Sequence, residues 1–386
     1  MRKDILASVR RLVIKIGSGV ISTDQGLDAA RIAAICEDVD TLLRRGYEII
    51  LVSSGAVAAG KKELGIDGRP PSIPLRQAAA AIGQSRLMRA YKEQLRPRGH
   101  LVAQVLLTRD DLNNRRRYLN ARNTLMTLLE HRVIPIINEN DTVVVEELRF
   151  GDNDNLSAMT ANLVEANLLV ILSDVDGLYD RDPGRHPDAR LLHEVERITP
   201  EIEAMAGESA SKLGTGGMVT KLKAAQRASL CGAATVILNG KKTGQLLRLF
   251  AGEPVGTLFR PAPGKMAARK HWIAFTKKPQ GSLRLDEGAA RALTAQGKSL
   301  LPTGIIGMEG RFERGDAVRI CDRQGRELAR GIVNYAHDEL ARIMGRKTFD
   351  IEAVLGYKYG DEIVHRDDLV LDRDRTRAME ESDDHS

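Results

Sequence analysis

Lys15 stands in a short apolar run that continues into the segment Ile16-Gly17-Ser18-Gly19. A lysine inside a buried strand is costly unless a charged partner or a ligand pairs with it. Glycines directly after the strand allow positive φ and let backbone N–H groups approach an anion closely. We therefore predict that Lys15 and Gly17 face an anionic ligand. The structural alternative is a tight turn beside a lysine whose ammonium group reaches solvent.

A second glycine-rich segment, Gly214-Thr215-Gly216-Gly217-Met218-Val219-Thr220-Lys221, comes directly before a predicted helix. Backbone N–H groups at a helix N-terminus bind phosphate. Lys221 falls in the first helical turn, where a cation opposes the helix dipole. That local cost is offset if the lysine faces a phosphate, so the segment predicts a polyphosphate site. A flexible loop with a surface lysine is the structural alternative.

The segment Ser53-Ser54-Gly55 ends another apolar run and precedes small residues typical of a helix packed on a sheet. The glycines and lysine that follow approximate the spacing of a phosphate-binding P-loop. However, Lys62 stands where that loop needs Ser or Thr to hold magnesium, so we reject the P-loop. We instead expect Ser54 and Gly55, at a helix N-terminus, to bind a carboxylate.

Two polar clusters, Asn138-Glu139-Asn140-Asp141 and Gly151-Asp152-Asn153-Asp154-Asn155, surround one strand end and the following helix start. In an open parallel sheet, ligands bind beyond the carboxyl ends of the strands. There Asp141 can receive an ammonium group, Asn153 can donate to a carboxylate, and Asp154 can hold lysines in place. Asx turns in ordinary polar loops are the alternative.

The segment Ser173-Asp174-Val175-Asp176-Gly177 superficially resembles a calcium loop. With Asp174 as position one, Tyr179 stands where that loop needs glycine, so the interpretation fails. No G-x-G-x-x-G fingerprint follows a predicted strand, which leaves nicotinamide dinucleotide chemistry without support. His365-Arg366-Asp367 lacks the trailing residues of a protein-kinase catalytic loop, and we treat it as structural.

These polar segments need a sheet that brings the strand ends together. Up to about residue 262, short β-branched runs alternate with segments of helical period, which predicts an α/β fold: an open, mainly parallel sheet between helices. Strands are expected at residues 12–16, 49–52, 102–107, 133–137, 168–172 and 235–238. Helices are expected from about residue 32 to Gly46 and at 75–95, 120–130, 155–164 and 220–230.

The sequence changes in character after residue 262. Prolines, glycines and paired lysines mark residues 263–278 as a linker. Short strand candidates at closer spacing follow at residues 281–285, 304–309, 317–321, 329–333 and 362–365. They predict a small, mostly β domain over residues 279–371. Residues 372–386 are dense in charge and predict a disordered tail. All of the candidate ligand-binding segments lie within residues 1–262, which form the expected catalytic domain.

The composition excludes several classes of protein. Hydrophobic residues make up 42% and charged residues 28%, as in ordinary globular proteins. No apolar run approaches the roughly 18 residues of a membrane span, and no signal core is present, so we expect a cytoplasmic protein. The three cysteines show no metal spacing, and no metal site is predicted. Residues 263–386 hold 22 Lys and Arg against 21 Asp and Glu, so no basic RNA-binding tail explains the net charge of +6.

The order of the motifs is more specific than any one of them. Starting with Lys15-Ile16-Gly17-Ser18 and ending with Thr220-Lys221, the series resembles the amino acid kinase family over roughly residues 8–372. Within that family it is similar to the branch that acts on L-glutamate. The segment after the linker resembles a PUA domain, and Gly356-Tyr357-Lys358-Tyr359-Gly360 looks like that branch's ending. The resemblance implies ATP-dependent phosphorylation of the γ-carboxylate of L-glutamate to L-glutamyl 5-phosphate, the first step of proline biosynthesis.

The resemblance also implies roles for the candidate residues. Lys15 and Lys221 would neutralise charge on the transferring phosphoryl group, and Asp154 would hold both lysines. The glutamate-binding residues would be Ser54, Gly55, Asp141 and Asn153. The ATP-binding residues would be Lys15, Gly17, Ser173, Asp174, Thr215, Gly216, Gly217, Met218, Val219, Thr220 and Lys221. Mg²⁺ would be held largely by ATP phosphates and water, with few protein ligands.

Other functions stay open at this point. An aspartate or acetylglutamate kinase is disfavoured by the PUA-like segment and the cluster at residues 151–155, and UMP kinases are far shorter. An RNA-binding protein is the alternative from another class, but the PUA-like segment has little net charge and no evident aromatic platform for stacking bases. The family implies a homo-oligomer, either dimer or tetramer, and handover of the labile product to glutamate-5-semialdehyde dehydrogenase. No membrane partner is expected.

Overall fold

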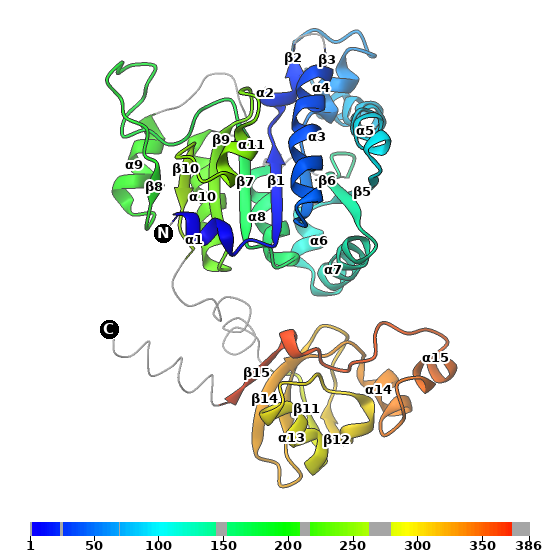
Figure 1. The fold of residues 1–386 in the computed structure, drawn as a ribbon. Coiled ribbons are helices and arrows are strands. Elements are labelled where there is room, and N and C mark those ends of the chain that lie inside the picture. The colour runs from blue at the N-terminus through cyan, green and yellow to red at the C-terminus, as the bar shows by residue number, and fades with distance from the viewer. Residues whose placement is uncertain are drawn as a thin grey trace. The chain divides into compact units, whose positions relative to one another are not determined.

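The computed structural model describes residues 2–23, 26–68, 70–143, 153–208, 217–261 and 279–372. The chain divides into two compact units, Met1–Lys265 and Met266–Ser386, and each is described by itself (Figure 1). Thr215, Gly216, the expected linker and the charged tail from residue 373 onward lie outside the described residues.

The first unit contains an eight-stranded sheet with the strand order β5-β6-β4-β1-β7-β9-β10-β8. In this spatial order, all neighbouring strands from β5 through β9 are parallel. Strand β10 is antiparallel to β9 and parallel to β8. The strands are β1 (Arg11–Ile16), β4 (Glu48–Ser53), β5 (Leu101–Leu107), β6 (Val133–Glu139), β7 (Leu168–Ser173), β8 (Glu194–Val195), β9 (Ala234–Asn239) and β10 (Thr257–Phe259). All six predicted strands are present, and the mainly parallel α/β fold is confirmed.

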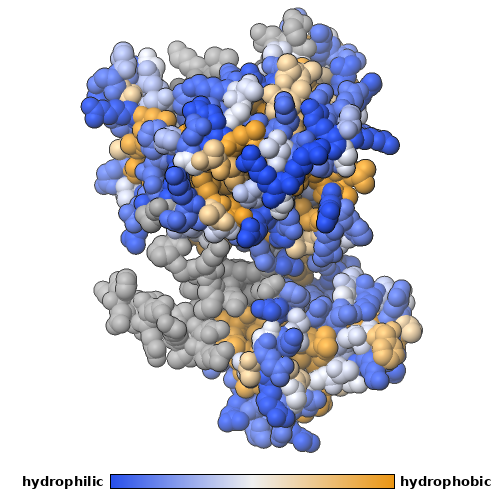
Figure 2. Space-filling model, viewed as in Figure 1, coloured by the Kyte–Doolittle hydropathy of each residue, from blue (hydrophilic) through white to orange (hydrophobic). Residues whose placement is uncertain are grey.

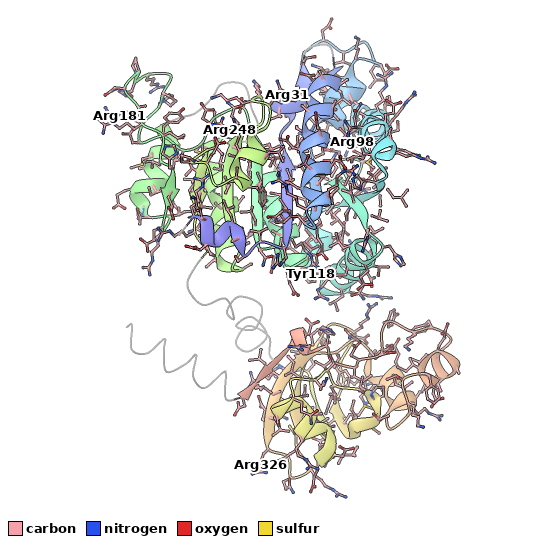
Figure 3. All side chains as sticks on the ribbon, viewed as in Figure 1. Arg31, Arg98, Tyr118, Arg181, Arg248 and Arg326 are labelled. Atoms are coloured by element: carbon pink, nitrogen blue, oxygen red, sulfur yellow. The ribbon has the colours of Figure 1, made fainter. Side chains whose placement is uncertain are left out.

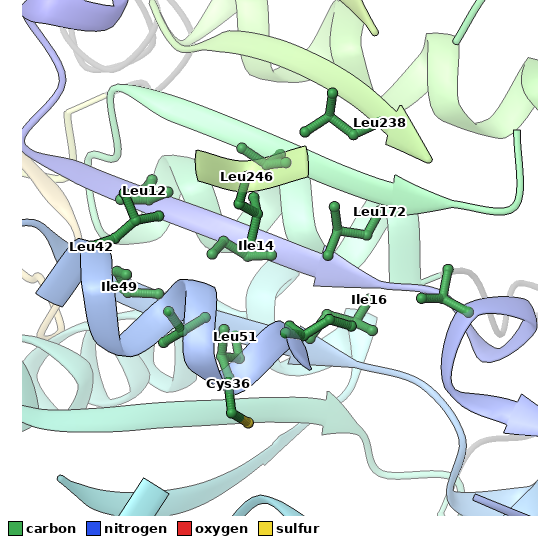
Figure 4. Packing of buried hydrophobic residues seen from close by; sticks show 14 of the residues in the cluster. Leu12, Ile14, Ile16, Cys36, Leu42, Ile49, Leu51, Leu172, Leu238 and Leu246 are labelled. Carbon is green, nitrogen blue, oxygen red and sulfur yellow. The ribbon is translucent and has the colours of Figure 1, made fainter. Parts of the chain in front are cut away.

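The two faces of this sheet pack against different helices. The first face is covered by α3 (Ala29–Arg44), α5 (Ile73–Leu95) and α11 (Gln245–Phe250). The second face is covered by α7 (Arg115–Glu130), α8 (Asn153–Leu163) and α10 (Met218–Leu230). In β1, the fully buried Leu12, Ile14 and Ile16 belong to the first core cluster (Figure 4), whereas Val13 belongs to the second. Because side chains alternate along a strand, Lys15 points with Val13 toward α8 and α10.

Local signals explain where the main helices begin and end. The side chain of Asp28 accepts a hydrogen bond from the Arg31 N–H and caps α3, which ends before Gly46 at a φ of +88°. Ser72 caps α5 in the same way, and a proline stands in its first turn. The remaining elements of this unit are α1 (Arg2–Ala7), α2 (Ser18–Ile21), β2 (Ser22–Thr23), β3 (Gly26–Leu27), α4 (Ala56–Lys61), α6 (Arg109–Asn113) and α9 (Pro200–Glu208).

The second unit is a small, mostly β structure with its own core. Its five-stranded sheet has the order β12-β11-β13-β14-β15, with β11 and β13 parallel and the other pairs antiparallel. The strands are β11 (Gly281–Leu285), β12 (Ile305–Gly310), β13 (Ala317–Cys321), β14 (Glu327–Ile332) and β15 (Leu369–Leu371), and the helices are α13 (Glu287–Ala295), α14 (His337–Ile343) and α15 (Asp350–Leu355).

One predicted strand of this unit is wrong. Residues 362–365 form no strand; Val364 makes only an isolated bridge to Leu300. The edge of the sheet is instead β15, which pairs with β14 in the register Gly331 to Leu369. Both segments are short and apolar, so sequence pattern alone could not choose the one that pairs. Among the described residues of the chain, no helix is long and apolar enough to span a membrane.

Candidate active site

The ends of three neighbouring strands are joined at the carboxyl edge of the first sheet. The Gly17 N–H donates to the Leu172 carbonyl at 3.2 Å, which links β1 to the end of β7. The Ser54 N–H donates to the Ile16 carbonyl at 3.0 Å, which links β4 to β1. The polar segments after β1, β4 and β7 therefore meet at one edge, as expected for a ligand site of an open parallel sheet.

A buried cluster of two lysines and one carboxylate lies at this edge. Lys15 Nζ is 2.5 Å from Asp154 Oδ1, and Lys221 Nζ is 3.3 Å from Asp154 Oδ2. Lys15 and Lys221 are only 6% and 5% exposed, and Asp154 is fully buried. Lys15 comes from β1, Asp154 from the start of α8 and Lys221 from the first turn of α10, so three distant segments build the cluster.

The electrostatics of the cluster suit an anionic ligand. Burial tends to raise the pKa of Asp154, but the adjacent Lys15 and Lys221 ammonium groups outweigh it and hold that pKa below its usual value. The carboxylate is therefore ionised at neutral pH. Together the three groups carry one net positive charge in a site with little water, where attraction for an anion is strong.

The start of α10 contributes to this cluster through its side chains. Thr220 Oγ1 lies 2.9 Å from Asp154 Oδ2 and 2.8 Å from the Gly217 carbonyl, so its hydroxyl helps to orient the carboxylate. Met218 is buried in the second core cluster, and Val219 is exposed. The first turn of α10 is thus anchored on one side and open on the other.

Ser54 and Asn153 are brought together from β4 and α8. Asn153 Nδ2 donates to Ser54 Oγ at 2.7 Å and to Asn138 Oδ1 at 3.1 Å. Asn138 Nδ2 in turn donates to Gln84 Oε1 at 2.9 Å. Both N–H groups of Asn153 therefore donate to neighbouring side chains. Gly55 follows Ser54 with a φ of +106°, a conformation that favours glycine.

Asp141 lies beyond β6 beside a cation that the sequence analysis did not single out. Arg76 Nη2, from α5, is 3.6 Å from Asp141 Oδ1. Burial raises the pKa of Asp141, and the Arg76 guanidinium offsets part of that rise. A carboxylate next to a guanidinium complements the ammonium and carboxylate groups of a free amino acid.

The segments after β1 and β7 are also in contact. Ser173 is buried, and its hydroxyl donates to the exposed Asp174 at 3.1 Å. A Cβ added to Gly17 would lie 3.3 Å from the Leu172 carbonyl, and one added to Gly19 would lie 3.7 Å from Asp174. Of the two properties that glycine allows after β1, positive φ is not used at Gly17, whose φ is −72°. Glycine serves close approach there, not an unusual backbone conformation.

The structure thus gathers Lys15, Asp154, Lys221, Ser54 and Asn153 at one sheet edge. Sequence reasoning missed Arg76, Gln84 and Asn138: Arg76 pairs with Asp141, Asn138 accepts from Asn153, and Gln84 accepts from Asn138. Asn138 stood inside a quoted motif. Gln84 carried a weaker signal: it is a polar residue on the buried stripe of α5, with Ala80, Leu87 and Tyr91.

The described residues show no cluster of three or more His, Cys, Asp or Glu side chains that could hold a metal ion.

The cations outside the site are mostly on the surface. Arg181 and Arg326 lie at the periphery of their units (Figure 3), and Arg248 is exposed. The visible face of each unit is largely hydrophilic, with smaller hydrophobic patches (Figure 2). The buried lysines therefore stand apart from the ordinary use of cations in this chain.

The first unit is an α/β fold with a mainly parallel sheet that carries a buried, net cationic cluster at its carboxyl edge. Residues 10–239 match the model of the Amino acid kinase family, and residues 281–355 match that of the PUA domain. The chain therefore belongs to the amino acid kinase family, with a PUA domain toward its C-terminus.

Full-length relatives give a finer comparison. The chain is 63% identical over 371 residues to the glutamate 5-kinase of Syntrophotalea carbinolica, covering 96% of this chain and 100% of the relative. It is 59% identical over 372 residues to the glutamate 5-kinase of Geobacter sulfurreducens, with the same coverage. A solved carbamate kinase from Giardia lamblia bound to AMP-PNP is 16% identical, with a TM-score of 0.48, covering 66% of this chain and 100% of that one.

Proposed function

We propose that this chain transfers the γ-phosphoryl group of ATP to the γ-carboxylate of L-glutamate, giving L-glutamyl 5-phosphate and ADP, the first step of proline biosynthesis. The observation that carries the phosphoryl transfer is the buried Lys15–Asp154–Lys221 cluster at the carboxyl edge of the sheet. The glutamate substrate is supported by the full-length relatives at about 60% identity.

The chemistry needs positioning and charge stabilisation more than proton transfer. An oxygen of the γ-carboxylate, already ionised at neutral pH, attacks the γ-phosphorus, while the bond to the bridging oxygen breaks and its electron pair leaves with ADP. Negative charge accumulates on the equatorial and bridging oxygens. Lys15 and Lys221 neutralise it, and Asp154 keeps both ammonium groups fixed before the reaction begins.

The glutamate subsite follows from the polar groups around the same edge. The Ser54 hydroxyl can donate to a substrate carboxylate, because its oxygen already accepts from Asn153. Asp141 would receive the α-ammonium group, and Arg76 the α-carboxylate. Gly55 shapes the backbone beside Ser54.

The nucleotide would lie beside the ends of β1 and β7 and the start of α10. Gly17, Ser173 and Asp174 line the first part, and residues 215–221 would cover the phosphates. Mg²⁺ would come bound to ATP, held mainly by its phosphates and by water. When bound, it would neutralise phosphate charge.

Hydroxylamine trapping of acyl phosphate tests the reaction directly. With ATP and Mg²⁺, we expect hydroxamate from L-glutamate and none from N-acetylglutamate or L-aspartate. If hydroxamate forms with N-acetylglutamate or L-aspartate instead, that acceptor replaces L-glutamate as the proposed substrate. If folded protein forms no hydroxamate with any of the three acceptors, the proposed kinase function is wrong.

The assignment of this activity to residues 1–262, with residues 279–371 as a separate PUA domain, belongs to the same proposal. So do a dimer or tetramer, which light scattering tests, and handover to glutamate-5-semialdehyde dehydrogenase. RNA binding by the second unit is the weakest of these. The Tyr359 ring contacts those of Tyr335 and Tyr357, but Arg314 of the same unit already covers the Tyr359 ring at 3.7 Å. A salt-dependent RNA titration of the full chain tests it.

A further inference from the structure

A line of side-chain amides runs from α5 to the substrate edge of the sheet. It begins at Gln84, passes through Asn138 at the end of β6 and ends at Asn153 and Ser54. Gln84 is 8% exposed and Asn138 is 2% exposed, so the line crosses a largely dry interior. We call this line the amide relay.

The amide relay is polarised. Each oxygen accepts from the next amide, so both N–H groups of Asn153 point back into the protein, to Asn138 and Ser54. Two consequences follow at the substrate edge. Ser54 accepts through its oxygen and keeps its hydroxyl hydrogen for a ligand. Asn153 Oδ1 is buried and has no hydrogen-bond donor among the residues that the structure describes.

The same side chains can also form the relay with every hydrogen bond reversed, so that donors and acceptors exchange roles. If the Gln84 amide turned over, its Nε2 would donate to Asn138 Oδ1, and Asn138 Nδ2 would donate to Asn153 Oδ1. Asn153 would then present an N–H to the site instead of an oxygen. An amino acid ligand offers an ammonium donor and carboxylate acceptors, so only the observed sense gives Asn153 an acceptor that suits the ammonium group.

The backbone of Gln84 is held firmly. Among the described residues its side chain forms one hydrogen bond, which its oxygen accepts from Asn138, since Gln84 Nε2 is buried with no partner there. The adjacent Gly83 lies against the backbone of α4: a Cβ there would be 1.8 Å from the Ala56 carbonyl oxygen. A Cβ on Gly60 would likewise be 1.9 Å from the Ala79 carbonyl oxygen. Helices α4 and α5 therefore cross in direct backbone contact, which fixes Gln84 relative to the Ser54 end of β4.

We propose that Gln84 is a positioning residue for the amino acid substrate: its oxygen sets the direction of the amide relay, so that Asn153 offers an acceptor and Ser54 a donor. Gln84 acts through Asn138 and Asn153 and need not touch the substrate. The inference rests on the proposed glutamate kinase function and deepens it.

Substitutions at Gln84 distinguish the effect of hydrogen-bond direction in the relay from the effect of charge on substrate binding. Glu keeps an accepting oxygen and preserves the observed sense, whereas Lys can only donate and imposes the opposite sense. Simple electrostatics predicts the reverse ranking, because Glu would repel the anionic substrate and Lys would attract it. Gln84→Met, which keeps the length of the side chain without hydrogen bonds, serves where a charged variant fails to fold. Gln94→Met, also on α5, is the matched control.

We would measure KM for L-glutamate, KM for ATP and kcat by hydroxamate formation at pH 8. We expect Gln84→Met to raise the glutamate KM about five- to tenfold, the effect of one or two lost hydrogen bonds, with KM for ATP within about twofold. Gln84→Glu should stay closer to wild type than Met, and Gln84→Lys should be the worst of the three.

Two outcomes would overturn the proposal. One is an unchanged glutamate KM in Gln84→Met. The other is a Lys variant that binds glutamate better than the Glu variant. Both require an active wild-type enzyme, so they differ from failure of the proposed function, in which the wild type itself makes no hydroxamate and both proposals fall.

Discussion

The two units of this chain both have complete hydrophobic cores, but they treat charge differently. In the described part of the first unit, two lysines are buried at the sheet edge, and both bind Asp154. In residues 279–372 no lysine or arginine is buried. The buried Asp322 there caps a turn through the Gln324 and Arg326 N–H groups. Buried cations are expensive to maintain, so their restriction to one edge marks where function lies.

Removal of one buried cation should give the largest effect on activity. Lys221→Ala leaves Asp154 paired with Lys15, so the protein should fold, while kcat falls about a thousandfold for loss of one stabilising charge. Steady-state kinetics and urea unfolding measure the two quantities. Lys223→Ala, an exposed lysine of the same helix, should keep full activity. Joint loss of folding and activity in the Lys221 variant would contradict its catalytic role.

Removal of the anion should damage stability as well as activity. Asp154→Asn keeps the shape but leaves two buried ammonium groups without their carboxylate, which should lower the unfolding free energy by about 3–5 kcal/mol. Because the pKa of Asp154 is lowered in the folded state, its contribution is present above about pH 4 and is lost as the pH falls toward that lowered pKa. The difference in unfolding free energy between wild type and Asp154→Asn should therefore become smaller at acid pH.

Urea unfolding between pH 3 and pH 8 measures this gap. Asp188→Asn, at an exposed position, should change stability little and serves as the control. A variant as stable as wild type at pH 8 would show that the cluster does not depend on Asp154.

Asp38 of α3 provides a contrast within the same unit. Burial raises its pKa to about 6, partly offset by a hydrogen bond from the Leu246 backbone. Its contribution to stability is therefore fully present below about pH 4 and is lost as the pH rises through 6. Asp38→Asn should be more stable than wild type by about 1 kcal/mol at pH 8, with the gain disappearing near pH 4 and no change in kcat. If the stability gained by Asp38→Asn increased as the pH fell, the raised pKa of Asp38 would not be its cause.

In the second unit we expect a change in stability with little change in activity. The Tyr335 hydroxyl donates to the Gly360 carbonyl at 2.6 Å and accepts from the Tyr359 N–H at 3.1 Å. Tyr335→Phe should lower the stability of this unit by about 1–2 kcal/mol, measured by calorimetry of the full chain, and leave kcat within twofold. Tyr357→Phe, at a more exposed hydroxyl, is the control. A large loss of kcat would show that the second unit acts on catalysis.

The sequence predicted the first sheet well because its central strands β1, β4, β7 and β9 are almost wholly buried and apolar on both faces. It also singled out Lys15 and Lys221, which the structure buries beside Asp154, since each breaks a local rule: one is a charge in a buried strand, the other a cation at the positive end of a helix. The edge strand of the second unit was misplaced, because residues 362–365 and 369–371 have similar apolar patterns and only long-range pairing chooses between them.

The sequence by itself thus determined the order of βα units, the separate β-rich module and the residue types at each strand end. Tertiary structure alone decided which of those residues meet. Asp154 joins Lys15 and Lys221 across 139 and 67 residues of chain, and Gln84 reaches Asn138 across 54. Periodicity indicates which face of an element a side chain occupies, but the direction of the hydrogen bonds along the relay depends on atoms that distant segments bring within hydrogen-bonding distance.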